Sequence, residues 1–165
     1  MNPIKNINLA GAGNVAFHLA KRFVQQDLNI HYLFNRTASK GKKLADLVDR
    51  LDLKVRSAHE GLQRTVTGGY ASDLLSDVLA NSREGNVWIT LQIHQNIVAV
   101  ASLKELAGIV LVSGREPEED TVEKAESEGI PVLVSGMSTF ELVGRLYELG
   151  IRSAGVERPA APGNR

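Results

Sequence analysis

The stretch Val66–Leu91, "VTGGYASDLLSDVLANSREGNVWITL", decides the fold class, because it contains a strand, a helix and a second strand in one short segment. Its two ends, Val66–Tyr70 and Val87–Leu91, are short runs of apolar and β-branched residues, which is typical of strands. The residues between them have helical length, and Trp88 in the second run is expected in the core. The sequence therefore predicts a βαβ unit with parallel strands.

The same alternation continues on both sides of this stretch. Helices are predicted in between, with Ser138 and Glu141 as a capping box, Asn96 as an N-cap, Pro117 in a first turn and Gly129 as a stop. We predict an α/β protein, a three-layer sandwich with a mostly parallel sheet. The further strands are expected at Ile7–Ala10, Ile30–Phe34, Lys54–Arg56, Ile109–Val112 and Val132–Val134.

The composition limits the functions to be considered. The 165 residues suffice for one well-buried domain or two small lobes, but not for a dinucleotide domain plus a separate catalytic domain. Basic and acidic residues number 19 each, which argues against nucleic acid or an anionic membrane as a partner. The chain has no cysteine, which excludes disulfides and thiolate chemistry. Since no apolar run reaches the roughly 18 residues of a membrane span, we expect a cytoplasmic protein.

The N-terminal segment Ile7–Phe23, "INLAGAGNVAFHLAKRF", predicts half of a dinucleotide-binding site. Gly11, Gly13 and Ala16 form a GxGxxA pattern directly after an apolar strand. In this pattern the first glycine makes a tight turn, the second leaves room for a pyrophosphate, and the alanine lets helix and strand pack closely. The helix that follows would offer its free N–H groups to phosphate.

The second predicted strand is followed by Asn35, Arg36 and Thr37. An acidic residue here would bind a ribose 2′-hydroxyl, whereas an arginine suits a 2′-phosphate, so these residues favour NADP over NAD as a cofactor. Residues 4–50 resemble the start of the NADP-binding Rossmann domains of coenzyme-F420-linked NADP oxidoreductases. The alternative is that the glycines serve only the tight turn and the helix packing, because no second half for the nicotinamide is recognisable.

The rest of the chain carries different landmarks, "TGGYASDLLSDVLAN", "HQNIVAVASLKELAGI" and "GREPEE". Together they resemble the DRTGG domain family over about Leu44 to Arg152. The resemblance implies a mixed α/β fold like the N-terminal domain of HPr kinase, and a regulatory or ligand-sensing role. This chain departs from the family name, since it reads "QRTVTGG" with Gln63 before Arg64, which leaves any role of an acid at that place unsupported.

We therefore expect a Rossmann-like βαβα segment over residues 1–50, a DRTGG-like domain over 51–152 and a disordered tail over 153–165. The segment Ser39–Val55, "SKGKKLADLVDRLDLKV", can supply a helix to both parts and contains no flexible linker. One continuous sheet, or two lobes that share this helix, is expected. Residues 1–52 carry 8 basic and 4 acidic residues and the remainder 11 and 15, so a recombined or engineered chimera is one explanation.

Ligands of open parallel sheets bind at the carboxyl ends of the strands, where small and polar residues occur in this chain. The glycine pair "GG" can form a backbone nest for an anion, and an arginine can hold phosphate through two hydrogen bonds. We select as candidate ligand-binding residues Gly68, Gly69, Asp73, His94, Asn96, Gly114 and Arg115.

Each of these candidates has a structural alternative. The glycines can simply make turns, Asp73 and Asn96 can cap helices, and Arg115 can pair with Glu116 or another acid nearby. His94 has no evident serine or carboxylate partner, so we predict no catalytic residue. The sequence shows no metal-ligand spacing and no Walker pattern, so the phosphoryl chemistry of kinases does not carry over.

Two hypotheses follow. The favoured one is a non-catalytic regulatory or ligand-binding module of DRTGG type that self-associates and binds a nucleotide or another phosphorylated metabolite. The alternative is an NADP-binding protein or a reduced oxidoreductase that uses the "GAGNVA" and "NRT" segments.

Overall fold

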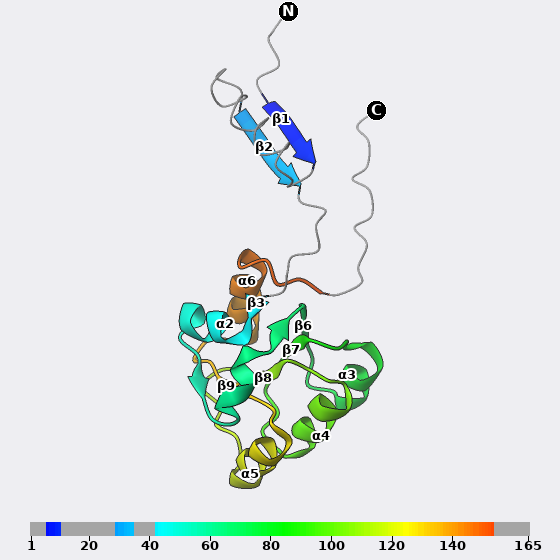
Figure 1. Ribbon diagram of the computed structural model, residues 1–165, viewed down its shortest axis with the longest axis vertical. Helices are drawn as coiled ribbons and strands as arrows, with labels where there is room; N and C mark the ends of the chain where they lie inside the picture. The colour runs from blue at the N-terminus through cyan, green and yellow to red at the C-terminus, as the bar shows by residue number, and fades with distance from the viewer. Residues whose placement is uncertain (1–5, 11–28, 35–41, 154–165) are drawn as a thin grey trace, which may run out of the picture. The chain divides into compact units, whose positions relative to one another are not determined.

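The computed structural model describes residues 6–10, 29–34 and 42–153. The chain divides into two compact units, Met1–Ser39 and Lys40–Arg165. Figure 1 shows the described strands and helices of both units. Among the described residues, no helix combines the length and the apolar character that crossing a membrane requires.

The N-terminal unit contains a pair of parallel strands, β1 (Asn6–Ala10) and β2 (Asn29–Phe34). Parallel neighbours need a crossover connection, and residues 11–28, which connect them, lie outside the described residues. The two strands form a sheet of their own. The described strands therefore do not form the one continuous sheet that was one of the two expected arrangements.

The larger unit is built on a five-stranded sheet in the order β4-β9-β8-β7-β6. Its last four strands in this order are parallel, and only the edge strand β4 runs antiparallel to its neighbour. The parallel strands lie side by side in chain order, which confirms the predicted mostly parallel α/β architecture. The bounds are β4 (Lys54–Val55), β6 (Gly68–Ala71), β7 (Asn86–Thr90), β8 (Gly108–Leu111) and β9 (Val132–Val134).

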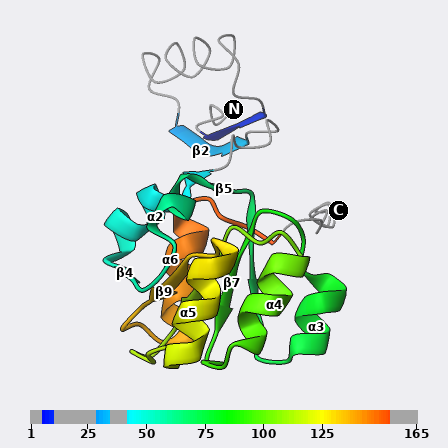
Figure 2. The same cartoon turned by 60° about the horizontal axis from the view of Figure 1, so that its bottom comes forward.

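Helices cover both faces of this sheet, as Figure 2 shows. One face carries α3 (Leu75–Asn81), α4 (Asn96–Leu103) and α5 (Glu119–Glu128), and the other carries α2 (Leu44–Leu51) and α6 (Thr139–Glu148). Strand residues alternate between two apolar cores, because successive side chains point to opposite faces. Trp88 belongs to the core under α3, α4 and α5, whereas Val87 and Ile89 belong to the core under α2 and α6. The buried Trp88 confirms its predicted place.

The larger unit also contains a 3-10 helix and a short pair of strands outside the five-stranded sheet. A 3-10 helix, η1 (His59–Gln63), follows β4, and β3 (Lys42–Lys43) pairs antiparallel with β5 (Thr65–Val66). Helix α2 lies between β3 and β4 and buries Leu44 and Leu47 in the core of the larger unit. The division of the chain therefore falls before this helix, at Ser39 and Lys40, whereas the sequence placed a boundary after residue 50.

Two helix ends follow the local sequence. The Ser138 hydroxyl accepts a hydrogen bond from the Glu141 backbone N–H at 3.4 Å, as the capping box predicts. The Glu141 carboxylate instead accepts from Arg145 Nε at 3.0 Å, so only half of the box is present. Gly129 has a φ of 64° and ends α5 in the left-handed conformation that glycine adopts without strain.

Two predicted helix starts are corrected. The residue that caps α5 is Glu118, so Pro117 lies before the helix and not in its first turn. Asn96 is the first residue of α4, and Gln95 occupies the capping position with helical dihedral angles. The prediction of Asn96 as an N-cap is wrong, because the turn before α4 is already helical one residue earlier.

Candidate functional site

The loops that follow the four parallel strands meet at one edge of the sheet, as the sequence predicted. Backbone hydrogen bonds join the loop after β8 to the loop after β9, from Ser113 N–H to the Met137 carbonyl and from Gly114 N–H to the Ser135 carbonyl, both at 2.8 Å. Ser113 and Gly114 have φ values of 58° and 66°, a left-handed pair that turns the chain sharply. The loops at this carboxyl edge are thus linked to one another by backbone hydrogen bonds.

Asp73 joins the first two of these loops. Its Oδ1 accepts hydrogen bonds from the Thr90 hydroxyl at 2.8 Å and from the Leu91 backbone N–H at 2.7 Å. The start of α3 is held separately, by the Ser72 hydroxyl, which accepts from the Leu74 N–H at 3.2 Å. Asp73 therefore does not cap α3, and its Oδ1 is already bound by two donors of the protein. It links the end of β6 to the end of β7.

His94 has a partner that the sequence did not reveal. Its Nδ1 lies 3.3 Å from Glu118 Oε2, and both side chains are about half exposed. Glu118 follows β8 and His94 follows β7, and these two strands are neighbours in the sheet. The signal that identifies Glu118 is this strand order, because the carboxyl ends of adjacent parallel strands bring their loops together. A hydrogen bond from Glu118 N–H to the Ile93 carbonyl at 3.2 Å supports the same approach.

Arg115 remains the most available cation of the edge. Within the described part of the chain its one side-chain hydrogen bond is a long one, 3.5 Å from Nη1 to the Leu91 carbonyl. Its predicted structural partner, Glu116, instead binds Arg56 through two hydrogen bonds of 2.6 and 2.8 Å. These bonds lower the pKa of the Glu116 carboxyl and raise the pKa of the Arg56 guanidinium. Most donors of Arg115 are therefore open to a ligand.

Gly68 and Gly69 do not belong to this edge. They are the first residues of β6 and pair with Asn86 and Val87, so they lie at the amino ends of the strands. The Gly69 N–H donates to the Arg152 carbonyl at 3.0 Å, which uses it for chain pairing and not for an anion. The predicted backbone nest is corrected: the strand that the sequence placed over Val66–Tyr70 is broken, and the glycine pair is inside its second piece.

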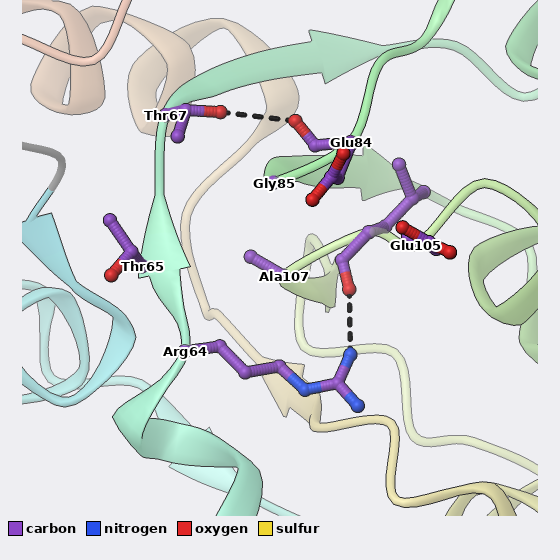
Figure 3. A pocket seen from close by; sticks show the side chains of 8 residues that line it. Arg64, Thr65, Thr67, Glu84, Gly85, Glu105 and Ala107 are labelled. Carbon is purple, nitrogen blue, oxygen red and sulfur yellow. Dashed lines mark hydrogen bonds between the residues drawn. The ribbon is translucent and has the colours of Figure 1, made fainter.

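The amino edge of the sheet carries a cavity of about 570 Å³. Figure 3 shows its lining, in which Arg64 reaches across from the chain before β5. Arg64 donates to the Leu106 and Gly129 carbonyls, each at 2.9 Å, so its guanidinium links three segments of the chain. The arginine of the "QRTVTGG" motif is thus a structural residue here. The lining residues are Arg64, Thr65, Thr67, Glu84, Gly85, Glu105, Leu106 and Ala107.

The predicted dinucleotide residues Gly11, Gly13, Ala16 and those of the "NRT" segment, Asn35, Arg36 and Thr37, lie outside the described residues. The same holds for residues 154–165 of the predicted tail. Of the described ranges, none contains a group of three or more histidine, aspartate or glutamate residues that could hold a metal ion.

No family model matches the sequence, and no curated protein matches it. Among solved structures, the chain is similar to the CBS and DRTGG domains of the regulatory region of a pyrophosphatase from Clostridium perfringens, solved with the activator diadenosine tetraphosphate. The identity is 13%, the TM-score is 0.53, and the match covers 97% of this chain and 80% of that chain. The described α/β unit therefore has a DRTGG-like fold. These comparisons give no support to a separate Rossmann origin of residues 4–50 or to a chimera.

Proposed function

We propose that this chain is a regulatory module that binds a nucleotide or another phosphorylated small molecule at the carboxyl edge of its five-stranded sheet. The observation that carries the proposal is the position of Arg115. Its guanidinium approaches the Leu91 carbonyl in the loop that also holds His94, and most of its donors have no protein partner among the described residues. An arginine with open donors is the side chain best suited to hold phosphate.

The surroundings of Arg115 support an anionic ligand. His94 lies in the neighbouring loop, where its Nδ1 is 3.3 Å from Glu118 Oε2, and this leaves Nε2 to interact with a ligand. The edge is also where ligands of parallel α/β sheets bind. The structurally similar pyrophosphatase region is regulatory and was solved with a nucleotide activator, which supports a nucleotide as the ligand class.

Binding, and not catalysis, is the role that these contacts favour. Asp73 uses one carboxylate oxygen to hold Thr90 and Leu91, so it is a poor general base. His94 and Glu118 are exposed, and an exposed pair lacks the water-excluded surroundings that make such groups effective in catalysis. A regulatory ligand needs only affinity, which one arginine and its neighbouring donors can supply.

Thermal unfolding of the full chain tests this proposal. Diadenosine tetraphosphate, ATP and inorganic phosphate are added in separate titrations, and a ligand of the native state raises the Tm. We expect a rise with at least one nucleotide that Arg115→Ala abolishes. Arg83→Ala is the matched control, because Arg83 is an exposed arginine of the turn before β7 at the other edge, and it should retain the rise. If no probe raises the Tm, or if both variants respond alike, the proposed site is wrong.

A second candidate, NADP binding by the N-terminal unit, has one observation in its favour. β1 and β2 are parallel, as the two strands around a dinucleotide-binding helix must be. Calorimetric titration with NADP and NAD tests it on the full chain, with Arg36→Ala as the variant and Arg50→Ala as the control. Preference for NADP that Arg36→Ala alone removes would support this candidate, and the absence of heat with both nucleotides would exclude it.

A further inference from the structure

The cavity at the amino edge of the sheet is separate from the proposed nucleotide site, which lies at the opposite ends of the strands. Backbone hydrogen bonds fix its walls, since the Gly85 N–H donates to the Glu105 carbonyl at 3.0 Å and the Thr67 N–H donates to the Gly85 carbonyl at 2.9 Å. In Figure 3, Thr65 and Thr67 lie across the cavity from Gly85. Its volume of about 570 Å³ is within the range of about 300–1,000 Å³ that is usual for small-molecule sites.

Most hydrogen-bond donors of the cavity lining already have partners in the protein. Both terminal nitrogens of Arg64 donate to backbone carbonyls at 2.9 Å. The Thr67 hydroxyl donates to the Glu84 carbonyl at 3.1 Å. An anionic ligand would therefore find few free donors in this cavity, although an arginine belongs to its lining.

The two carboxylates of the lining, in contrast, are free. Glu84 and Glu105 are exposed, and the hydrogen bond from the Gly85 N–H to the Glu105 carbonyl holds their two turns together. The ion pairs within residues 42–153 all involve other acidic residues. The carboxylates of Glu84 and Glu105 therefore have no cationic partner among these residues. A cavity with two unpaired charges of the same sign attracts a ligand of the opposite sign.

Glu105 occupies a position where a glutamate is locally unfavourable. It follows Lys104, the C-terminal capping residue of α4, and has a φ of 51°. The Leu106 N–H donates to the Ala101 carbonyl at 2.9 Å, which makes this helix end a Schellman motif. Glycine is the usual residue at this left-handed position, and a carboxylate there also meets the negative end of the helix dipole. Residues that oppose local preferences in this way are typical of functional sites.

We infer that this cavity binds a polyamine, a linear organic amine with two or more ammonium groups. One ammonium group binds the Glu84 carboxylate and a second binds the Glu105 carboxylate, while the Thr65 hydroxyl accepts a further N–H. A metal ion is a poor occupant, because the described ranges contain no group of three or more residues that could ligate one. A nucleotide is a poor occupant as well, because its phosphates would be repelled by the two carboxylates.

Calorimetric titration of the full chain with spermidine at physiological ionic strength tests the proposal. A saturable heat is expected. Glu84→Gln and Glu105→Gln should each raise the Kd about two- to fivefold, which is the usual effect of removing a solvent-exposed ion pair, and the double substitution should remove saturable binding. Glu123→Gln is the matched control, because Glu123 is an exposed glutamate of α5 and its replacement changes the net charge equally. This control should bind spermidine as the natural chain does.

Glu105→Gly separates a loss of binding from a loss of folding. Glycine adopts the left-handed conformation without strain and removes a negative charge from the end of α4, so the ligand-free variant should have a Tm at least as high as that of the natural chain. The same variant should bind spermidine as weakly as Glu105→Gln does. A chain that keeps its stability and loses affinity would show that the carboxylate serves the ligand and not the fold.

Three results would overturn the proposal. The absence of a saturable heat with spermidine shows that the cavity holds no polyamine. Equal losses of affinity in Glu84→Gln and Glu123→Gln show a diffuse attraction to surface charge. Displacement of spermidine by an equal concentration of Mg²⁺ shows that the carboxylates accept any small cation. Arg115→Ala should leave spermidine binding unchanged, so a failure of the proposed nucleotide site does not affect this test.

Discussion

Asp73 accepts a hydrogen bond of 2.8 Å from the hydroxyl of Thr90, and through this contact the end of one parallel strand holds the end of its neighbour. The same carboxylate oxygen accepts from the Leu91 N–H at 2.7 Å. A single side chain thus positions the loop that carries His94, and with it one wall of the proposed ligand site.

Removal of this carboxylate should loosen the carboxyl edge. We expect Asp73→Ala to lower the free energy of unfolding by about 1–3 kcal/mol, because two hydrogen bonds to a charged acceptor are lost. Urea unfolding measures the change. Asp49→Ala, an exposed aspartate on α2, should stay within about 0.5 kcal/mol of the natural chain. Equal losses in both variants would contradict the role given to Asp73.

Arg64 should be irreplaceable by lysine, although the charge is conserved. Its planar guanidinium reaches the Leu106 and Gly129 carbonyls at once, at 2.9 Å each. An ammonium group is a point donor on a flexible stem and cannot span both. We expect Arg64→Lys to cost about 1–3 kcal/mol in chemical unfolding, against no measurable cost for Arg83→Lys. A neutral Arg64→Lys would mean that the two carbonyls are satisfied by water.

The hydrogen bond between Tyr70 and Asp77 should stabilise the native state by an amount that decreases at both low and high pH. Hydrogen bonds from Ser72, Tyr70 and Asn81 lower the pKa of Asp77 below 3.8, and the bond to Asp77 raises the pKa of Tyr70 above 10.0. A lowered carboxyl pKa stabilises the native state above pH 3.8, and this contribution is lost as the pH falls through the native pKa. A raised tyrosine pKa stabilises it below pH 10.0, and this contribution is lost as the pH rises through the native value.

Chemical unfolding across the pH range measures both effects. The natural chain should be more stable than Asp77→Asn near neutral pH, and the difference should shrink below pH 3.8. The natural chain should also be more stable than Tyr70→Phe near neutral pH. This difference in the free energy of unfolding should decrease above pH 10.0. Differences that do not vary with pH would show that the hydrogen bonds do not distinguish the charged from the neutral forms.

Gly85 and Gly136 differ in whether the backbone can accept an alanine, so substitutions at the two positions can be compared. Gly85 has a φ of +73°, and a Cβ there would lie 2.6 Å from Thr67 Oγ1, so Gly85→Ala should cost about 1–3 kcal/mol. Gly136 has nothing within 4 Å of the same position and no positive φ, so Gly136→Ala should be nearly neutral. Thermal unfolding of the two variants compares them directly, and a reversed order would contradict the described turn before β7.

The local part of the fold was predictable because it depends on residues close together in the chain. The predicted strand Val132–Val134 has the observed bounds, and Ile30–Phe34 differs from the observed strand by one residue at its start. Apolar periodicity and β-branched residues act within a few positions, so they are readable from the sequence. Errors occurred at turns, as at Asn96 and Pro117, where one residue more or less of helix changes the capping position.

The candidate site could be predicted only in the edge of the sheet where its residues lie. The rule that loops gather at the carboxyl ends of parallel strands correctly placed His94, Gly114 and Arg115 at one edge. It misplaced Gly68 and Gly69, because the break between β5 and β6 has no strong turn signal in "TVTGG". The partner of each side chain could not be predicted. Glu118, for example, lies near His94 only because β7 and β8 are neighbours in the sheet.

By itself, the sequence determined the class of the fold, the order of the main strands and helices of the larger unit, and the edge at which polar residues collect. Only the tertiary structure decided that Asp73 and Arg64 are structural, that Arg115 keeps open donors, and that α6 exposes Phe140 and Tyr147. The reason is physical: secondary structure arises from short-range periodicity, whereas partners and exposure depend on which distant segments the sheet brings side by side.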